Sequence, residues 1–276
     1  MNIRSLSPLE SKLILRLEWD KQFVVTIDDV ARILDISTEH ARQVLHRLAR
    51  DRWLAMITPG KYELIPAERG EHAFTDANPL FIGSVMVSPY YFSYATAAYF
   101  HGLSTQAALT VFIATTQDKP RQRLVRDKEY RLVRLPSHKF FGWKEVNAYG
   151  SKVNMAEPEK TILDCLDRPD LSGDIPEIAA MLVYGSSKVD WVQLSDYASR
   201  FKSKALIQRL GYLLEILKLP VEGAILDRLS SAYGTRSKCY LGQPGKWGAG
   251  GIYNPAWRVV DNIPKRELFA EIEVRS

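Results

Sequence analysis

The chain has 276 residues, of which 46% are hydrophobic and 25% charged, and its formal net charge is +5. This length and composition suggest about two globular domains with sizeable cores and argue against a disordered chain. The apolar runs are too short for a membrane span, and the first residues lack the apolar core of a signal peptide, so we expect a cytoplasmic protein.

The first predicted helix begins at Ser7. Ser7 can cap it, Pro8 suits its first position, and Glu10 completes a capping box. Apolar residues then recur at helical spacing as far as Trp19. This helix is expected to support the two that follow.

Two short helices and a hairpin are predicted between residues 26 and 65. Thr26 with Asp29 can cap one helix, and Ser37 can cap another that runs to about residue 51. The buried stripe of that last helix is predicted to consist of Ala41, Val44, Leu45 and Leu48. Two apolar runs around a Pro59-Gly60 turn then predict a hairpin.

The opposite face of the 37–51 helix is predicted to be free and to carry side chains that donate to phosphates and base edges. These candidate DNA-binding residues are Thr38, Arg42, Gln43, His46, Arg47 and Arg50, together with Lys61 in the hairpin. The order of helix, turn, basic helix and hairpin favours a winged helix-turn-helix. The alternative is a three-helix module whose charges form an ordinary solvated face.

A polar stretch bounded by Pro66 and Pro79 lacks periodicity and predicts a linker. We therefore expect an α+β protein with a winged domain at residues 1–72 and a larger mixed domain at 79–276, which has a small sheet and a helical C-terminal half. The larger domain is predicted to contain a helix at 93–103, a mostly antiparallel sheet from runs at 109–115, 130–135 and 143–155, helices at 157–167 and within 175–229, and a final strand at 268–274.

A basic stripe lies between residues 119 and 144, where nine Lys or Arg residues accompany two acidic ones. It predicts a second anionic-ligand surface formed by arginines on strands. The candidate residues of this surface are Arg121, Arg123, Arg126, Arg131 and Arg134. RNA or an acidic protein could bind there, and simple solvation of an exposed sheet is the alternative.

Three stretches of the larger domain resemble one protein family. They are Ser93-Tyr94 through Leu103, Met155-Ala156-Glu157-Pro158-Glu159-Lys160 through Pro169, and Gln208-Arg209-Leu210-Gly211-Tyr212-Leu213-Leu214-Glu215. With the predicted winged N-terminus and the closing Trp257-Arg258-Val259-Val260-Asp261-Asn262, the chain resembles the AbiEi-type antitoxins of abortive-infection, or type IV, toxin-antitoxin systems.

The resemblance implies a transcriptional repressor that binds its own double-stranded operator, expected to carry inverted repeats, and serves in phage defence. It also implies that the second domain counters a nucleotidyltransferase toxin without forming a stable complex. A stand-alone regulator without a toxin is the alternative. Many relatives have Arg-Gly-x-Tyr at the hairpin tip, whereas this chain has Pro59-Gly60-Lys61-Tyr62, so a wing-tip phosphate contact falls to Lys61.

Catalytic motifs are weak, and we predict a protein that is not an enzyme and uses no metal or other cofactor. Gly185-Ser186 before Asp190 lacks the second carboxylate that a Mg²⁺-dependent nucleotidyltransferase needs, and is interpreted as a turn between helices with Ser as the cap. Residues 245–251 are glycine-rich without Walker spacing and predict a mobile loop. Pro169-Asp170 lacks the Glu-x-Lys of a nuclease. Cys165 and Cys239 have no metal-ligand spacing and are interpreted as reduced thiols.

Overall fold

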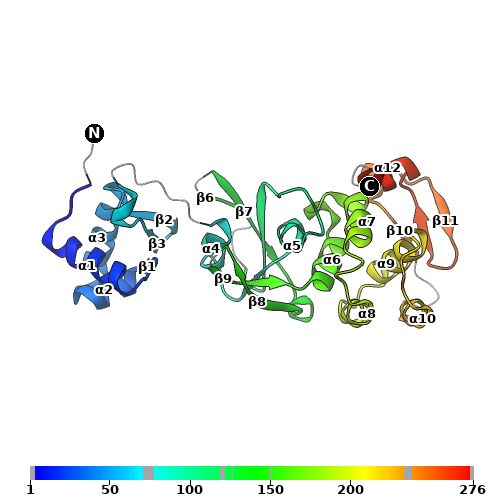
Figure 1. Cartoon of the computed structure of the whole chain (residues 1–276), viewed down its shortest axis with the longest axis horizontal. Coiled ribbons are helices and arrows are strands. Elements are labelled where there is room, and N and C mark those ends of the chain that lie inside the picture. The colour runs from blue at the N-terminus through cyan, green and yellow to red at the C-terminus, as the bar shows by residue number, and fades with distance from the viewer. Residues whose placement is uncertain are drawn as a thin grey trace. The chain divides into compact units, whose positions relative to one another are not determined.

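The computed structural model describes residues 4–70, 78–118, 122–125, 127–149, 151–232 and 238–273. The chain divides into two compact units, Met1–Asn78 and Pro79–Ser276, which we call the N-terminal and C-terminal units. Helices and sheets occur in both (Figure 1), so the predicted α+β class is confirmed.

Within residues 4–70 the N-terminal unit combines α-helices with an antiparallel three-stranded sheet of order β1-β3-β2. Its elements are α1 (Pro8–Trp19), β1 (Val24–Thr26), α2 (Ile27–Leu34), α3 (Thr38–Arg50), β2 (Leu54–Thr58), β3 (Lys61–Leu64) and the short 3-10 helix η1 (Ala67–Arg69). The α-helices and the β2–β3 hairpin lie where the sequence predicts them, whereas β1 was not predicted, because its three residues are too few to show a pattern.

Local side chains cap the start of α1, α2 and α3 as predicted. The Ser7 backbone N–H donates to Glu10 Oε2 over 2.9 Å, and Thr26 and Asp29 cap α2 in the same reciprocal way. Ser37 Oγ accepts from the His40 N–H at the start of α3. Asp35, in the left-handed conformation with φ of 55°, ends α2 and turns the chain toward α3.

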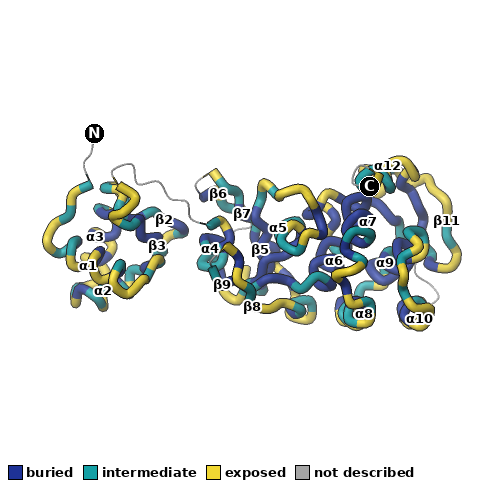
Figure 2. The backbone as a smooth tube through the Cα atoms, in the orientation of Figure 1, coloured by how far each residue is buried: buried dark blue, intermediate teal, exposed yellow. Residues whose placement is uncertain are grey.

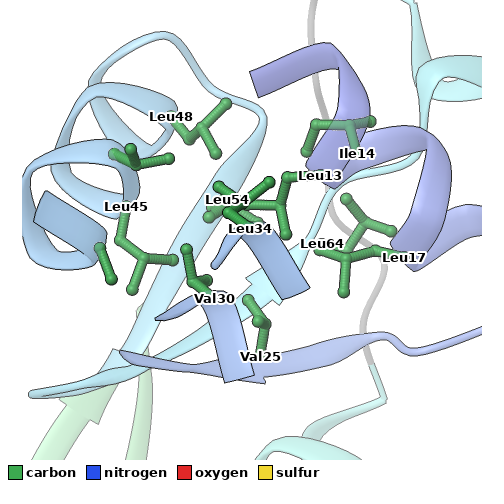
Figure 3. Close-up of a cluster of buried hydrophobic side chains, with 12 residues drawn as sticks. Leu13, Ile14, Leu17, Val25, Val30, Leu34, Leu45, Leu48, Leu54 and Leu64 are labelled. Carbon is green, nitrogen blue, oxygen red and sulfur yellow. The ribbon is translucent and has the colours of Figure 1, made fainter. Parts of the chain in front are cut away.

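One apolar core holds the three helices and the hairpin together (Figure 3). Leu13 and Leu17 reach it from α1, Val30 from α2, Leu45 from α3 and Leu54 from β2, and none is more than 2% exposed. Burying a side chain of this size contributes about 1.5–3 kcal/mol. The core therefore fixes which face of α3 is turned inward.

The C-terminal unit is built on a six-stranded sheet of order β6-β7-β5-β4-β9-β8. Its strands are β4 (Tyr90–Phe92), β5 (Thr110–Thr115), β6 (Gln122–Val125), β7 (Lys128–Arg134), β8 (Trp143–Ala148) and β9 (Ser151–Ala156). The β5–β7 and β4–β9 pairs are parallel and the other three pairs are antiparallel. The prediction of a mostly antiparallel sheet is confirmed by three of the five pairs. The strands β4 and β6 and the two parallel pairs were not predicted, because these short strands show no alternation to detect.

Helices cover both faces of this sheet at its central strand β4. Tyr91 and Phe92 are neighbours in β4 and so point to opposite faces. Phe92 lies against Gly83 of α4 (Pro79–Ser84), whereas Tyr91 donates to Asp164 of α6 (Pro158–Asp167). As a result, most residues of α6 are buried (Figure 2).

The remaining helices are α5 (Tyr94–Phe100), α7 (Asp174–Tyr184), α8 (Trp191–Arg200), α9 (Lys204–Ile216), α10 (Gly223–Ala232), α11 (Pro244–Trp247) and α12 (Lys265–Glu273), with 3-10 turns η2 (Ser137–Lys139) and η3 (Pro169–Leu171). A second sheet of order β10-β12-β11 is formed by β10 (Cys239–Tyr240), β11 (Ile252–Asn254) and β12 (Val259–Asp261). Gln208 of α9 donates to the carbonyl of Trp257, which joins this sheet to the helices.

Three expectations for the C-terminal unit are wrong. The predicted strand at 268–274 is helix α12 as far as Glu273, since its alternation has only Leu268 buried and its residues are good helix formers. Asp190, not Ser186, caps α8, because its carboxylate accepts from the Val192 and Gln193 N–H groups. The glycine-rich stretch starts as α11 and is held by Trp247, whose Nε1 donates to Asp174 over 2.8 Å.

Candidate nucleic-acid interface

Helix α3 has a buried face and a polar face, as its sequence predicts. Ala41, Val44, Leu45 and Leu48 are at most 1% exposed and pack in the core. The polar face consists of the exposed Thr38, Arg42, Gln43, His46 and Arg50 and the half-buried Arg47. We call these six residues the α3 polar face.

The α3 polar face is arranged in two rows along the helix. Thr38, Arg42, His46 and Arg50 follow one another at intervals of four residues, and Gln43 and Arg47 form a second row beside them. Side chains four apart on a helix are neighbours, so each row presents a continuous line of donors. Such a surface suits the edge of a nucleic-acid groove, where phosphates and base acceptors also lie in lines.

The arginines of this face differ in how they are held. Arg42 pairs with Glu39 at 3.3 Å, and both side chains are more than half exposed, so water and salt compete with the pair. Arg50 pairs with its neighbour Asp51 at 2.9 Å. These partners lie on α3 or at its end, and both arginine side chains remain more than half exposed.

Arg47 departs from the expectation of a free face, because its Nε donates to Glu10 Oε1 of α1 over 3.0 Å. Glu10 as a whole residue is only 5% exposed. Burial alone would raise the pKa of this carboxyl, but hydrogen bonds from Ser7 and Arg47 and the Arg47 charge outweigh it, so its pKa is lowered. Sequence reasoning missed this contact, since 37 residues separate the two side chains.

The β2–β3 hairpin carries Lys61 next to its tip. Gly60 has φ of 81°, a conformation that favours glycine, and it reverses the chain before Lys61. In the strand register, Lys61 lies opposite Thr58 of β2 and opposite Thr26 of β1, and Thr26 is also the cap of α2. The hairpin tip is thus tied to the helices of the same unit.

The basic stripe at 119–144 is not one surface in the residues that the structure describes. Arg123 lies opposite Tyr130 in the β6–β7 register, so the two share a face, and Arg134 shares it by its even spacing from Tyr130. Arg131 follows Tyr130 directly and points to the other face, 3.9 Å from Asp170. The described arginines of the stripe therefore do not all lie on one face of the sheet, while Arg121 and Arg126 lie outside the described residues.

A buried polar cluster in the C-terminal unit was not predicted. Lys160 and Asp164 of α6 are paired directly and are 0% and 1% exposed. The carboxylate also accepts from Ser93 Oγ at 2.6 Å, and Lys160 Nζ lies 2.8 Å from the hydroxyl of Tyr91. Burial lowers the pKa of Lys160 and raises that of Asp164, which shifts both toward their neutral forms.

This cluster is where two of the three resemblance stretches meet, because Ser93 comes from the first and Lys160 and Asp164 from the second. Its groups are enclosed by aromatic rings, with Phe201 centred 4.7 Å from Lys160 Nζ. A closed cluster of this kind orders the unit rather than contacting a substrate. The signal for this cluster in the sequence is a lysine and an aspartate four residues apart, Lys160 and Asp164, on a helix whose other residues are mostly buried.

The described part of the chain contains no group of three or more His, Cys, Asp or Glu residues placed to hold a metal ion. Cys165 is buried, Cys239 is half-buried, and neither forms a disulfide.

None of the helices within the described ranges is long and apolar enough to cross a membrane.

No protein-family model and no curated protein matches the chain. Among solved structures it is similar to the RV2827C protein from Mycobacterium tuberculosis, with 18% sequence identity and a TM-score of 0.71 over 99% of this chain and 97% of that one. The chain and the mycobacterial protein therefore share an α+β fold along almost their entire lengths.

Proposed function

We propose that the N-terminal unit is a winged helix-turn-helix that binds double-stranded operator DNA sequence-specifically. In this proposal α3 lies in the major groove and the β2–β3 hairpin, as the wing, contacts the backbone. The observation that carries the proposal is the α3 polar face, two rows of donors of which all but the half-buried Arg47 are exposed, on a helix whose other face packs in the core. A recognition helix requires this combination of a free polar face and a rigid support.

We further propose that the chain represses its own operon and that the C-terminal unit counters a nucleotidyltransferase toxin without a stable complex. The support is the resemblance to AbiEi-type antitoxins at residues 93–103, 155–169 and 208–215, two of which meet at the buried Lys160–Asp164 pair. The proposal assigns no catalysis and no cofactor to the chain. A stand-alone regulator would keep the DNA-binding half of this proposal and drop the toxin.

The DNA-binding proposal predicts two classes of variant. Arg42→Ala and Gln43→Ala should each cost about 1–3 kcal/mol of binding to the preferred duplex and relax its base preference at one position, because a base contact is lost. Lys61→Ala should weaken binding to all duplexes alike and reduce the slope of log K against log salt by about one unit, because a phosphate contact is lost.

These variants are compared by titrating the full chain with a duplex selected from a randomised pool and with the unselected pool. Lys12→Ala on α1, which also removes an exposed cation but lies outside the α3 polar face, serves as the control. Identical sequence preferences for the α3 and Lys61 variants would contradict the assignment of helix to groove and wing to backbone.

A further inference from the structure

We infer that Glu10 is a positioning residue that presents Arg47 to DNA, an inference that rests on the proposed function of the N-terminal unit. Glu10 lies on the supporting helix α1, whereas Arg47 lies on α3. Among the ion pairs found in residues 4–70, only the pair of Glu10 and Arg47 links α1 to α3.

The Glu10 carboxylate is held in place by contacts other than the one with Arg47. Its Oε2 accepts from the Ser7 N–H over 2.9 Å, as one half of the capping box that starts α1. The side chain is 7% exposed, so it is held by packing as well as by this hydrogen bond. Its other oxygen, Oε1, accepts from Arg47 Nε and is thus a preorganised anchor.

Arg47 uses only part of its guanidinium in this contact. Nε is the donor to Glu10, and neither terminal nitrogen has a partner within residues 4–70 or the other described ranges. The side chain is 42% exposed. A guanidinium is planar and carries its donors in a rigid fork, so fixing Nε leaves the edge formed by the two terminal nitrogens for a bidentate contact.

Such an edge matches two acceptors of DNA, the O6 and N7 pair of guanine and the oxygens of one phosphate. Because Arg47 is ordered before binding, less side-chain freedom is lost when it meets the duplex. The buried carboxylate also repels phosphates, so Glu10 should favour the duplex that lets Arg47 reach its acceptors and disfavour others. Arg42 is different, since its partner Glu39 is itself 70% exposed.

The test compares binding of the full-length chain to a duplex selected from a randomised pool with binding to the unselected pool. Glu10→Gln keeps an oxygen that can accept from the Ser7 N–H but loses the charge, and it should lower the ratio of selected to unselected affinity about fivefold to tenfold. Affinity for the unselected pool should stay equal or rise, because a negative charge near phosphates is removed. Glu39→Gln, which breaks the exposed pair, should leave the ratio unchanged.

A double-mutant cycle distinguishes positioning from mere support of the fold. In an Arg47→Ala chain, Glu10→Gln should no longer change the ratio, whereas a loss of fold would lower both affinities whatever residue stands at 47. Arg47→Lys keeps the charge without the fork and should reproduce the effect of Glu10→Gln, even if the latter proves too unstable to measure.

The outcomes separate this inference from the function on which it rests. If Arg47→Ala lowers the ratio while Glu10→Gln and Arg47→Lys leave it at the parental value, Glu10 has no positioning role although the unit still reads DNA. If the parent shows no preference for any duplex, the proposed function fails and the inference fails with it.

Discussion

Replacing Asp164 by Ala should destabilise the C-terminal unit by about 3–5 kcal/mol, because it leaves the Lys160 ammonium buried without its partner. The hydroxyls of Ser93 and Tyr91 would lose their acceptor at the same time. The rings of Tyr91, Phe141 and Phe201 around Lys160 Nζ cannot replace a carboxylate, although they attract the cation. A protein domain is stable by only about 5–15 kcal/mol, so a large part of this margin would be lost.

Calorimetric melting of the full-length chain measures this effect. Asp170→Ala is the matched control, since Asp170, like Asp164, pairs with a cationic side chain, here that of Arg168, but both of those side chains are more than one-third exposed. It should cost less than about 1 kcal/mol. Combining Asp164→Leu with Lys160→Met should recover much of the loss, because a buried pair can often be replaced by apolar residues. Equal effects of Asp164→Ala and Asp170→Ala would show that the buried cluster contributes no more to stability than an exposed ion pair.

Replacing Gly211 by Ala should destabilise the C-terminal unit by about 3 kcal/mol, although alanine is the better helix former by about 1 kcal/mol. A Cβ at Gly211 in α9 would lie 2.0 Å from Cζ3 of Trp257. The indole cannot move aside easily, because its Nε1 donates to Glu215 and Trp257 is only 4% exposed. The clash therefore outweighs the gain in helix propensity.

Gly223→Ala in α10 is the control for this experiment, since a Cβ there has no atom within 4 Å. It should leave the urea midpoint of the full-length chain unchanged or raise it slightly. If Gly211→Ala raised the midpoint as well, the packing of Trp257 on α9 would not be tight, and the link between α9 and the β10-β12-β11 sheet would be weaker than described.

The sequence predicted best those elements whose signals are local. Ser7, Thr26 and Ser37 each cap a helix through a backbone N–H three residues later in the chain. A few neighbouring residues are therefore enough to predict where these helices begin. The buried stripe of α3 also follows from spacing alone, and the residues of its polar face are predictable for the same reason.

Features that depend on distant residues were missed. Glu10 looked like a capping residue only, because nothing near it in the sequence points to Arg47. Lys160 stands in the first turn of α6, where a lysine is usually solvated, yet packing of β4 on α6 buries it completely. Short central strands such as β4 carry too few residues to show a period, so the mixed topology of the sheet was not foreseen.

Photocrosslinking tests the central claim that α3 reads the bases of DNA most directly. The full-length chain would be bound to its selected duplex with 5-iodouracil in place of single thymines, a substitution that puts the reactive group in the major groove. We expect crosslinked peptides within Thr38–Arg50, and fewer of them after Arg42→Ala or Gln43→Ala. Crosslinks confined to the C-terminal unit, or an equal yield from the selected and unselected duplexes, would contradict the account.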